Sequence, residues 1–196
     1  MARRPGLDRD TVVQAAVDLL DSEGAGTLSL GRLAERLGVQ TPSLYNHVEG
    51  MPGLLRQLAL RNARDLAACM GDAAMGKSGP EAVLAVAEAY RAYIKQHSGL
   101  YMASLRAAGA QVQDGSPPDA ELAEAEARVV RIVLAVLASF GLAGEDAIHA
   151  VRGLRSVVHG FATLEVAGGF GLPLDCDESF RRLVGMLVAG LREKVS

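Results

Sequence analysis

The sequence predicts a nearly all-α protein of about nine helices. Alanine and leucine dominate its 196 residues, and the alternation of β-branched and polar residues that indicates strands is missing. The 22 glycines gather where helices should end and form no repeat. With 49% hydrophobic residues, the chain can bury a substantial core in one or two domains. We expect a three-helix domain over residues 1–50 and a larger helical domain over 51–196, with a helix from about 51 linking them.

The N-terminus begins with a short basic arm, MARRPGL, that carries Arg3 and Arg4. This arm is either a frayed terminus or a segment that reaches phosphates or a minor groove. Asp8 is placed to cap a first helix that runs to about Glu23, where Gly24 stops it. This helix would complete a three-helix unit with the two that follow.

The stretch LSLGRLAERLGVQTPSLYNH reads as two short helices joined by a tight turn. In the first, apolar residues recur at helical spacing from Leu30 to Leu37, and Ser29 is placed as its N-cap. Gly38 supplies the positive φ that ends a helix and reverses the chain. The second helix should start with Thr41 as N-cap and Pro42 at the first helical position, and run to His47.

This second helix has very little apolar surface, because only Leu44 and Val48 look like core residues. The rest of the stretch is polar or amphipathic. A helix of this kind is better explained as a probe held out by its neighbours than as a packing element. Its polar residues are Gln40, Thr41, Ser43, Tyr45, Asn46 and His47.

Helical periodicity continues through the rest of the chain, with Pro80 expected at the first position of one helix and Ser98 as the cap of another. The segment 107–119, AAGAQVQDGSPPD, has the weakest pattern and is expected to be a mobile loop. A bend, GGFGLP, separates the last two helices. The expected helices cover about 51–75, 80–96, 98–106, 121–140, 144–166 and 178–193.

Composition excludes several classes of protein. Cys69 and Cys176 are far apart and form no CxxC motif, so we expect neither a disulfide nor a metal site, and a reducing cytoplasm. No apolar segment follows the N-terminal arginines, and the longest uncharged apolar run, 132–144, is too short to span a bilayer. No nucleophile–base pair or phosphate loop indicates an enzyme or a cofactor.

Charge weighs against a general polyanion binder, because the net charge is −3. Residues 1–65 hold eight arginines and eight acidic residues, so the N-terminal region is neutral overall. If this region binds DNA, its positive charge must be placed locally.

Residues 8–58 resemble the DNA-binding domain of tetracycline-repressor-type (TetR family) regulators. The resemblance rests on AAVDLLDSEGAGTLSL, then LAERLGV, then TPSLYNHV followed by LL. The C-terminal half weakly resembles the subgroup named for a Trp-His-Gly motif, which here reads Val158-His159-Gly160-Phe161 without the tryptophan.

The resemblance implies a homodimer that places two recognition helices in successive major grooves of a double-stranded DNA operator. It also implies a ligand-binding domain that changes the spacing of those helices. Carried over by position, Thr41 and Pro42 contact base edges and thymine methyls, and Ser29 a phosphate, while Ser43, Tyr45 and His47 contact phosphates or neighbouring bases. The full expected DNA-binding set is Arg3, Arg4, Ser29, Arg32, Gln40, Thr41, Pro42, Ser43, Tyr45, Asn46 and His47.

Three departures from the family pattern reduce the expected affinity. Gly31 stands where a longer side chain reads a base in the family. Met51 replaces a lysine that often contacts phosphate, and Glu49 lies nearby. We therefore expect a specific, salt-sensitive and rather modest DNA binder.

The C-terminal half should hold an effector pocket and a dimer interface. Each expected pocket residue is otherwise explained as core, and the interface residues as buried within the monomer. The dimer would form a four-helix bundle from the last two helices of each subunit. The expected pocket residues are Tyr90, Tyr93, Tyr101, Met102, Leu105, Phe140, His159 and Phe161. The expected interface residues are Val151, Leu154, Val158, Phe180, Leu183, Val184, Leu187 and Leu191.

The leading hypothesis is a dimeric, ligand-responsive repressor of a near-palindromic operator, released by a small apolar effector and not associated with a membrane. The alternative is a helical small-molecule-binding protein whose DNA binding is weak or vestigial. Steep salt dependence and selectivity for one DNA sequence would separate the two.

Overall fold

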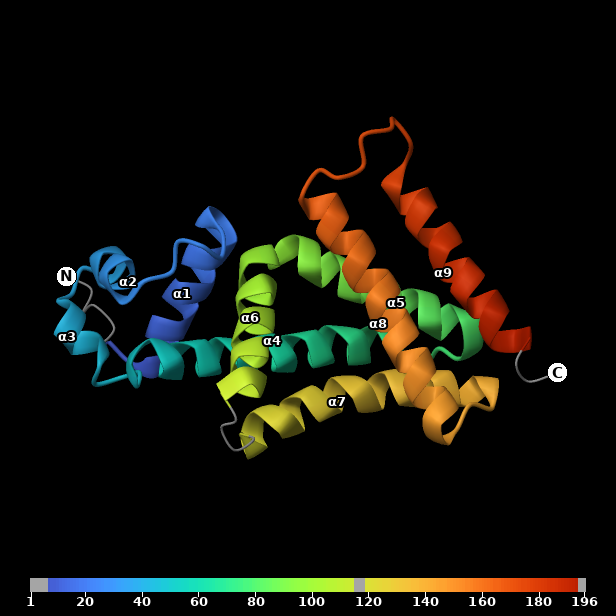
Figure 1. Cartoon of the computed structure of the whole chain (residues 1–196), viewed down its shortest axis with the longest axis horizontal. Coiled ribbons are helices and arrows are strands. Elements are labelled where there is room, and N and C mark those ends of the chain that lie inside the picture. Colours follow the sequence, from blue (N-terminus) through green and yellow to red (C-terminus); the bar gives the residue numbers. More distant parts are fainter. Residues whose placement is uncertain (1–6, 115–118, 194–196) are drawn as a thin grey trace. The chain divides into compact units, whose positions relative to one another are not determined.

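The computed structural model describes residues 7–114 and 119–193, and within these ranges all regular structure is helical (Figure 1). This agrees with the predicted all-α fold of about nine helices. The elements are α1 Arg9–Glu23, α2 Leu30–Leu37, α3 Thr41–Leu44, α4 Gly50–Ala74, α5 Gly79–Gln96, α6 Ser98–Asp114, α7 Ala120–Leu137, the 3-10 helix η1 Ala138–Phe140, α8 Gly144–Val166 and α9 Cys176–Glu193.

The described residues form two compact units. The first unit takes the chain up to Asn62 together with His97–Leu122, and the second takes Ala63–Gln96 and the chain from Ala123 onward. The unit that contains the helix–turn–helix is therefore larger than residues 1–50, because the first half of α4 and all of the described part of α6 belong to it.

The first unit is built on a core that α1, α2, α3, α4 and α6 share. Leu33, Leu44, Leu54 and Leu58 are fully buried there, and Leu100 on α6 joins the same cluster. Predicted caps define the helix starts, since the Asp8 side chain accepts a hydrogen bond from the Thr11 amide and that of Ser29 accepts one from the Arg32 amide. The sequence therefore predicted the first two helices correctly.

Helices α1 and α6 approach each other unusually closely. A Cβ atom added to Gly99 would lie 1.9 Å from the carbonyl oxygen of Leu20, so only glycine fits at this position. The Asp21 carboxylate lies 2.7 Å from Nδ1 of His97 and accepts a 3.1 Å hydrogen bond from the amide of Leu100. Asp21 on α1 thus satisfies one of the free amides at the start of α6.

The second helix of the predicted helix–turn–helix pair is shorter than predicted. Helix α3 ends at Leu44, and Tyr45–His47 form turns instead of a further helical turn. The predicted cap was also wrong, because Gln40 occupies the N-cap position and Thr41 already lies inside the helix. In a helix of four residues, almost all backbone amides and carbonyls lie at a helix end and have no partner within the helix. Contacts with other helices must therefore hold this segment in place.

Three further predictions about the middle of the chain were wrong. Helix α6 continues to Asp114, although residues 107–119 were expected to be a loop. Alanine and glutamine favour a helix without any apolar periodicity, and periodicity was the signal used for this segment. In addition, α5 begins at Gly79, so Pro80 is its second residue, and α6 begins at Ser98, so Ser98 is not its cap.

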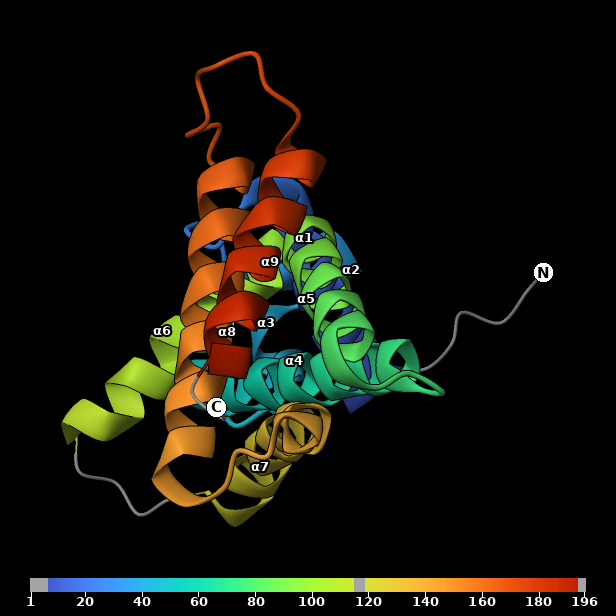
Figure 2. The ribbon, with the colours of Figure 1, turned by 90° about the vertical axis from the view of Figure 1, so that its right-hand side faces the viewer.

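In the second unit, α5, α8 and α9 pack on one another. Figure 2 shows α8 and α9 running side by side, with the connection between them extending beyond their ends. Val86, Val158, Phe180 and Val184 are buried at the centre of this group. Among the described residues, no single helix has the length and apolar character to cross a membrane; one bent pair, 120–140 with 144–166, meets that test only jointly.

Candidate DNA interface

Residues 40–48 (the α3 segment) are anchored by two apolar side chains and expose polar ones. Leu44 and Val48 are buried in the core of the first unit. Tyr45 is 59% exposed. The other predicted contacts around it also reach the surface: Gln40, Pro42 and Asn46 are exposed, and Thr41, Ser43 and His47 are half-buried. The structure thus brings together the predicted polar residues of residues 40–47 on one short exposed segment.

Two glycines with positive φ set the direction of this segment. Gly38 has a φ of 67° and its amide donates to the Ala34 and Glu35 carbonyls, so α2 ends sharply. Gly50 also has a φ of 67°, and a Cβ added there would lie 3.6 Å from the ring of Tyr45. The tyrosine ring therefore lies close to the start of α4, and its side chain remains largely exposed.

Arg9 supports the turn after α3, although sequence reasoning did not select it. Its Nε donates a 3.3 Å hydrogen bond to the carbonyl oxygen of His47. This contact ties the beginning of α1 to the end of the exposed segment. Hydroxyl, phenol and imidazole groups held in this way can donate to phosphate oxygens or to base edges.

The arginines of α2 are engaged in ion pairs. Arg32, a predicted DNA contact, pairs with Glu23 at the end of α1, and Arg36 Nη1 lies 3.9 Å from the same carboxylate. Sequence reasoning missed this pairing because it depends on how α1 packs against α2. Arg3 and Arg4 lie outside the described residues.

The three departures from the family pattern are all visible. Gly31 is exposed, and a Cβ added to it would meet no atom within 4 Å. Met51 is half-buried against the core of the first unit, and Glu49 is exposed. None of the three supplies positive charge to the interface.

The expected effector residues are divided between the two units. Tyr90, Tyr93, Phe140 and Phe161 are buried and belong to the second unit. The His159 side chain, also in that unit, is half-buried, and its burial, followed by the charge of Arg155, lowers its pKa. The remaining three, Tyr101, Met102 and Leu105, belong to the first unit.

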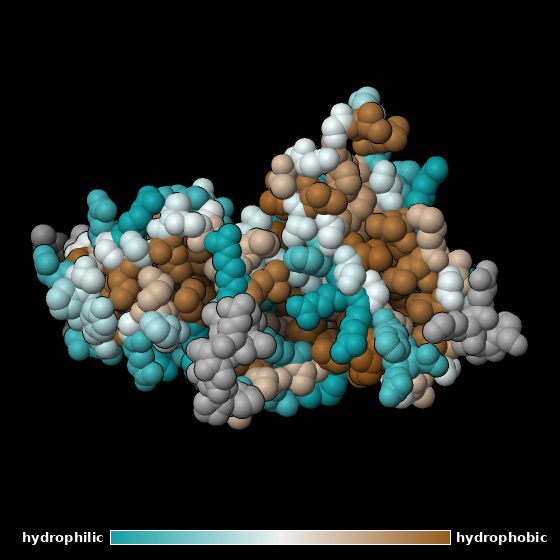
Figure 3. Space-filling view, in the orientation of Figure 1, coloured by the Kyte–Doolittle hydropathy of each residue, from teal (hydrophilic) through white to brown (hydrophobic). Residues whose placement is uncertain are grey.

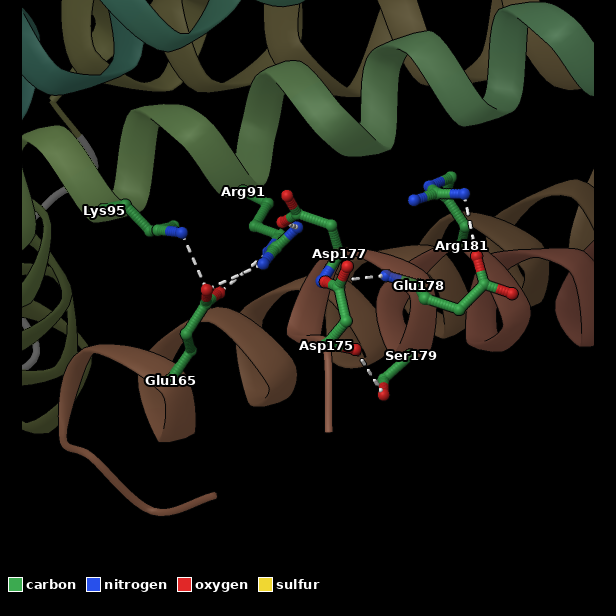
Figure 4. Close-up of polar contacts among 8 residues, drawn as sticks. All are labelled: Arg91, Lys95, Glu165, Asp175, Asp177, Glu178, Ser179 and Arg181. Carbon is green, nitrogen blue, oxygen red and sulfur yellow. Dashed lines mark hydrogen bonds and ion pairs between the residues drawn. The ribbon is translucent and has the colours of Figure 1, made fainter. Parts of the chain in front are cut away.

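A cluster of charged residues around Arg91 was not predicted. Arg91 on α5 is only 7% exposed, and its Nε and Nη2 each donate a 2.7 Å hydrogen bond to the Glu165 carboxylate at the end of α8 (Figure 4). Its Nη1 lies 2.8 Å from Asp177 on α9, and Lys95 donates a 2.7 Å bond to Glu165. The guanidinium also lies over the ring of Phe180, 4.9 Å from its centroid.

This cluster joins three helices around one buried cation. The hydrogen bonds to Glu165 raise the pKa of Arg91, and the Arg91 guanidinium in turn lowers the pKa of Glu165. A groove of about 570 Å³ beside it has a charged lining that differs from the expected aromatic pocket. The lining residues are Glu88, Arg91, Ala92, Lys95, Gln96, Asp177 and Arg181.

Most of the expected interface residues lie inside the monomer. Helices α8 and α9, which carry these residues, pack on each other and on α5 within the single chain. Leu183 and Leu187 are half-buried. The buried residues are Val151, Leu154, Val158, Phe180, Val184 and Leu191.

The fold and the exposed segment define the class of helix–turn–helix proteins with a helical C-terminal region. A family model described as the C-terminal domain of tetracycline-repressor-like proteins matches residues 83–187. The helix–turn–helix-type transcriptional regulator Rv0681 of Mycobacterium tuberculosis is 35% identical over 196 residues, which are all of this chain and 87% of that protein. The regulator YobS of Bacillus subtilis is 33% identical over 97% of this chain and 96% of its own length.

The chain therefore belongs to the tetracycline-repressor (TetR) family of transcriptional regulators. A solved structure shares the fold, that of a TetR variant from Acinetobacter baumannii AYE in complex with minocycline. It aligns with a TM-score of 0.71 and 23% identity over 97% of this chain and 99% of its own. The names of the relatives agree with the prediction of a regulator rather than an enzyme.

Proposed function

We propose that this regulator is a homodimeric repressor that binds a near-palindromic operator through α3 and leaves it when a small effector binds. The observation that carries the proposal is the α3 segment, where two buried side chains, Leu44 and Val48, hold a row of polar ones at the surface. Most side chains of this segment are not needed for packing, and their chemistry suits a major groove.

The proposed contacts divide into two kinds. Thr41 and Pro42 would touch base edges and thymine methyl groups, which carry sequence information. Ser29, Ser43, Tyr45 and others nearby would bind phosphates and set the position of the protein on the duplex. The start of α2 adds free amides next to Ser29, and these favour a phosphate without a high net charge.

The dimer is proposed to form through the exposed faces of α8 and α9. Apolar residues gather over these helices in Figure 3. Ile148 and Leu164 on α8 and Met186 on α9 are exposed apolar residues. Met186 is 65% exposed, and a Cβ added to the neighbouring Gly185 would meet no atom within 4 Å, so a second helix has room to approach. Two such pairs would form a four-helix bundle.

A dimer of this kind can be tested by charge insertion. Met186→Glu should lower the mass measured by sedimentation at micromolar concentration from dimer to monomer. Leu172→Glu, which changes an even more exposed leucine in the α8–α9 connection, should leave the mass unchanged. A monomeric wild-type protein would contradict the proposed assembly.

The effector is proposed to be small and largely apolar, and to bind in the second unit. The buried aromatic residues Tyr90, Tyr93 and Phe140 support an apolar site of the usual kind. The A. baumannii protein of similar fold binds minocycline. The effector would favour a dimer whose two α3 segments no longer match the operator, which lowers DNA affinity.

The decisive experiment is selection of duplexes from a random-sequence library by the full-length protein, followed by footprinting. The expected result is a near-palindromic sequence with half-sites roughly 34–36 Å apart and binding that weakens steeply with salt. Enrichment of no sequence above bulk DNA would contradict the repressor.

The second candidate is a helical small-molecule-binding protein with weak or vestigial DNA binding. The pairing of Arg32 with Glu23 favours it, because it removes a cation from the proposed interface. In that case the same selection would enrich no sequence, while ligand binding to the second unit would persist.

A further inference from the structure

Glu23 is the last residue of α1, and its carboxylate forms ion pairs with two arginines of α2. Gly24 ends α1 with a φ of 89°, and the amide and hydroxyl of Thr27 both donate to its carbonyl oxygen, at 3.2 and 2.8 Å. This compact connection holds the last residue of α1 against α2. Arg32 and Arg36, four residues apart on one face of α2, both turn toward the Glu23 carboxylate.

Neither Glu23 nor Arg32 is placed to stabilise its own helix. Glu23 lies in the last turn of α1, which contains no basic residue, so it stands at the negative end of the helix dipole. Arg32 lies in the first turn of α2, which contains no acidic residue, at the positive end of that dipole. Each charge offsets the unfavourable position of the other, and the pair remains accessible, with side chains 35% and 50% exposed.

We propose that Glu23 competes with DNA phosphates for Arg32 and Arg36, and thereby sets the DNA affinity of this regulator. The inference rests on the proposed function, in which Ser29 and the start of α2 face the DNA backbone. A phosphate offers the same kind of charged oxygen as a carboxylate, so it can take over the guanidinium of Arg32. When DNA binds, Arg32 exchanges the Glu23 carboxylate for a phosphate, so it gains no additional ion pair.

This exchange has two consequences for binding. It lowers the affinity for every duplex, because the displaced carboxylate remains near the phosphates. It leaves sequence preference to the α3 segment, since phosphate contacts carry no base information. Glu23 is therefore an affinity-setting residue and not a contact that reads sequence.

The test compares Glu23→Gln with the wild-type protein, both full length, by fluorescence anisotropy on a fixed mixed-sequence duplex and on the duplex selected by the wild type. We expect about three- to ten-fold tighter binding of both duplexes by the variant at low salt, by the same factor. The slope of log affinity against log salt should become steeper by up to about 0.9, the value for one phosphate contact.

Two further variants make the result specific. Glu23→Lys also suits the end of the α1 dipole and should tighten binding more than Glu23→Gln does. Glu35→Gln removes an equal charge from the exposed surface of α2, outside the Glu23 cluster, and should change affinity less. In an Arg32→Gln/Arg36→Gln background, the gain from Glu23→Gln should largely disappear.

An affinity of Glu23→Gln equal to wild type, or a gain that persists in the Arg32→Gln/Arg36→Gln background, would overturn the inference while the wild type still binds DNA. A wild-type protein that binds neither duplex would overturn the proposed function, and this inference with it. Thermal unfolding of each variant shows whether a loss of binding reflects a loss of folding.

Discussion

The guanidinium of Arg91 on α5 and the carboxylate of Glu165 near the end of α8 share two hydrogen bonds of 2.7 Å, and both side chains are largely buried. Buried ion pairs are costly to form and more costly to break, because removal of one partner leaves the other charge buried and uncompensated. This pair therefore governs the stability of the second unit more than surface pairs do.

Glu165→Gln should destabilise the protein by about 3 kcal/mol, measured by urea unfolding, because the buried Arg91 guanidinium loses two charged hydrogen bonds and keeps the largely exposed Asp177 as its anionic partner. The double variant Arg91→Met/Glu165→Leu should recover much of this loss, since no charge is left buried between the two positions. Glu124→Gln breaks the exposed pair with Arg131 and serves as a control with no measurable effect. Equal destabilisation by the single and double variants would contradict the argument.

The same pair predicts how stability depends on pH. The hydrogen bonds from Arg91 hold the pKa of Glu165 below its ordinary value of 4.5, so the unfolded chain binds this proton more readily than the folded one. The contribution of Glu165 is fully present above about pH 4.5 and is lost as the pH falls through the lowered pKa. Unfolding free energies measured between pH 3 and 6 should fall less steeply toward acid in Glu165→Gln. A profile parallel to wild type would show that other groups dominate.

The close approach of α1 and α6 predicts opposite effects for two glycine substitutions. Gly99→Ala should cost about 3 kcal/mol of stability, because the new methyl group would collide with the Leu20 carbonyl. Gly31→Ala, in the open first turn of α2, should stabilise by about 0.5 kcal/mol through lower backbone entropy in the unfolded chain. Thermal unfolding measures both, and similar effects of the two substitutions would refute the close contact.

Two substitutions test the proposed DNA contacts. Tyr45→Phe removes one exposed hydroxyl and His47→Ala removes one imidazole, and each should weaken operator binding about ten-fold, the value of one hydrogen bond to a charged phosphate. Gel shifts report the affinity, and thermal unfolding should show that Tyr45→Phe remains as stable as wild type. Unchanged affinity in both variants would contradict the proposed role of the α3 segment in DNA binding.

Local signals in the sequence predicted much of the first unit. The side chains of Asp8 and Ser29 cap the helices they were expected to cap, and Gly38 reverses the chain with a positive φ. These features depend on residues a few positions apart, which a single sequence displays. The exposed polar residues of the α3 segment were found for the same reason.

Contacts between distant segments could not be predicted in this way. Arg91 and Glu165 are 74 residues apart, and no spacing links them. Val158 and Phe180 were assigned to a dimer contact because both lie on apolar faces, and periodicity does not tell which partner covers such a face. The hydrogen bond from Arg9 to the carbonyl of His47, in the turn after α3, joins residues 38 positions apart and is also a tertiary contact.

The unit that holds the helix–turn–helix is assembled from two separate stretches of chain, since Leu100 and Ala103 of α6 complete the core that Leu33 and Leu44 begin. The helix–turn–helix is consequently not part of a domain made from one continuous stretch of chain. A fragment that ends near Asn62 would lack part of its own interior and would expose apolar side chains to water. Transfer of the DNA-binding part of this chain to another protein would therefore need α6 along with the first 62 residues, and a cut near residue 50 would divide one compact unit.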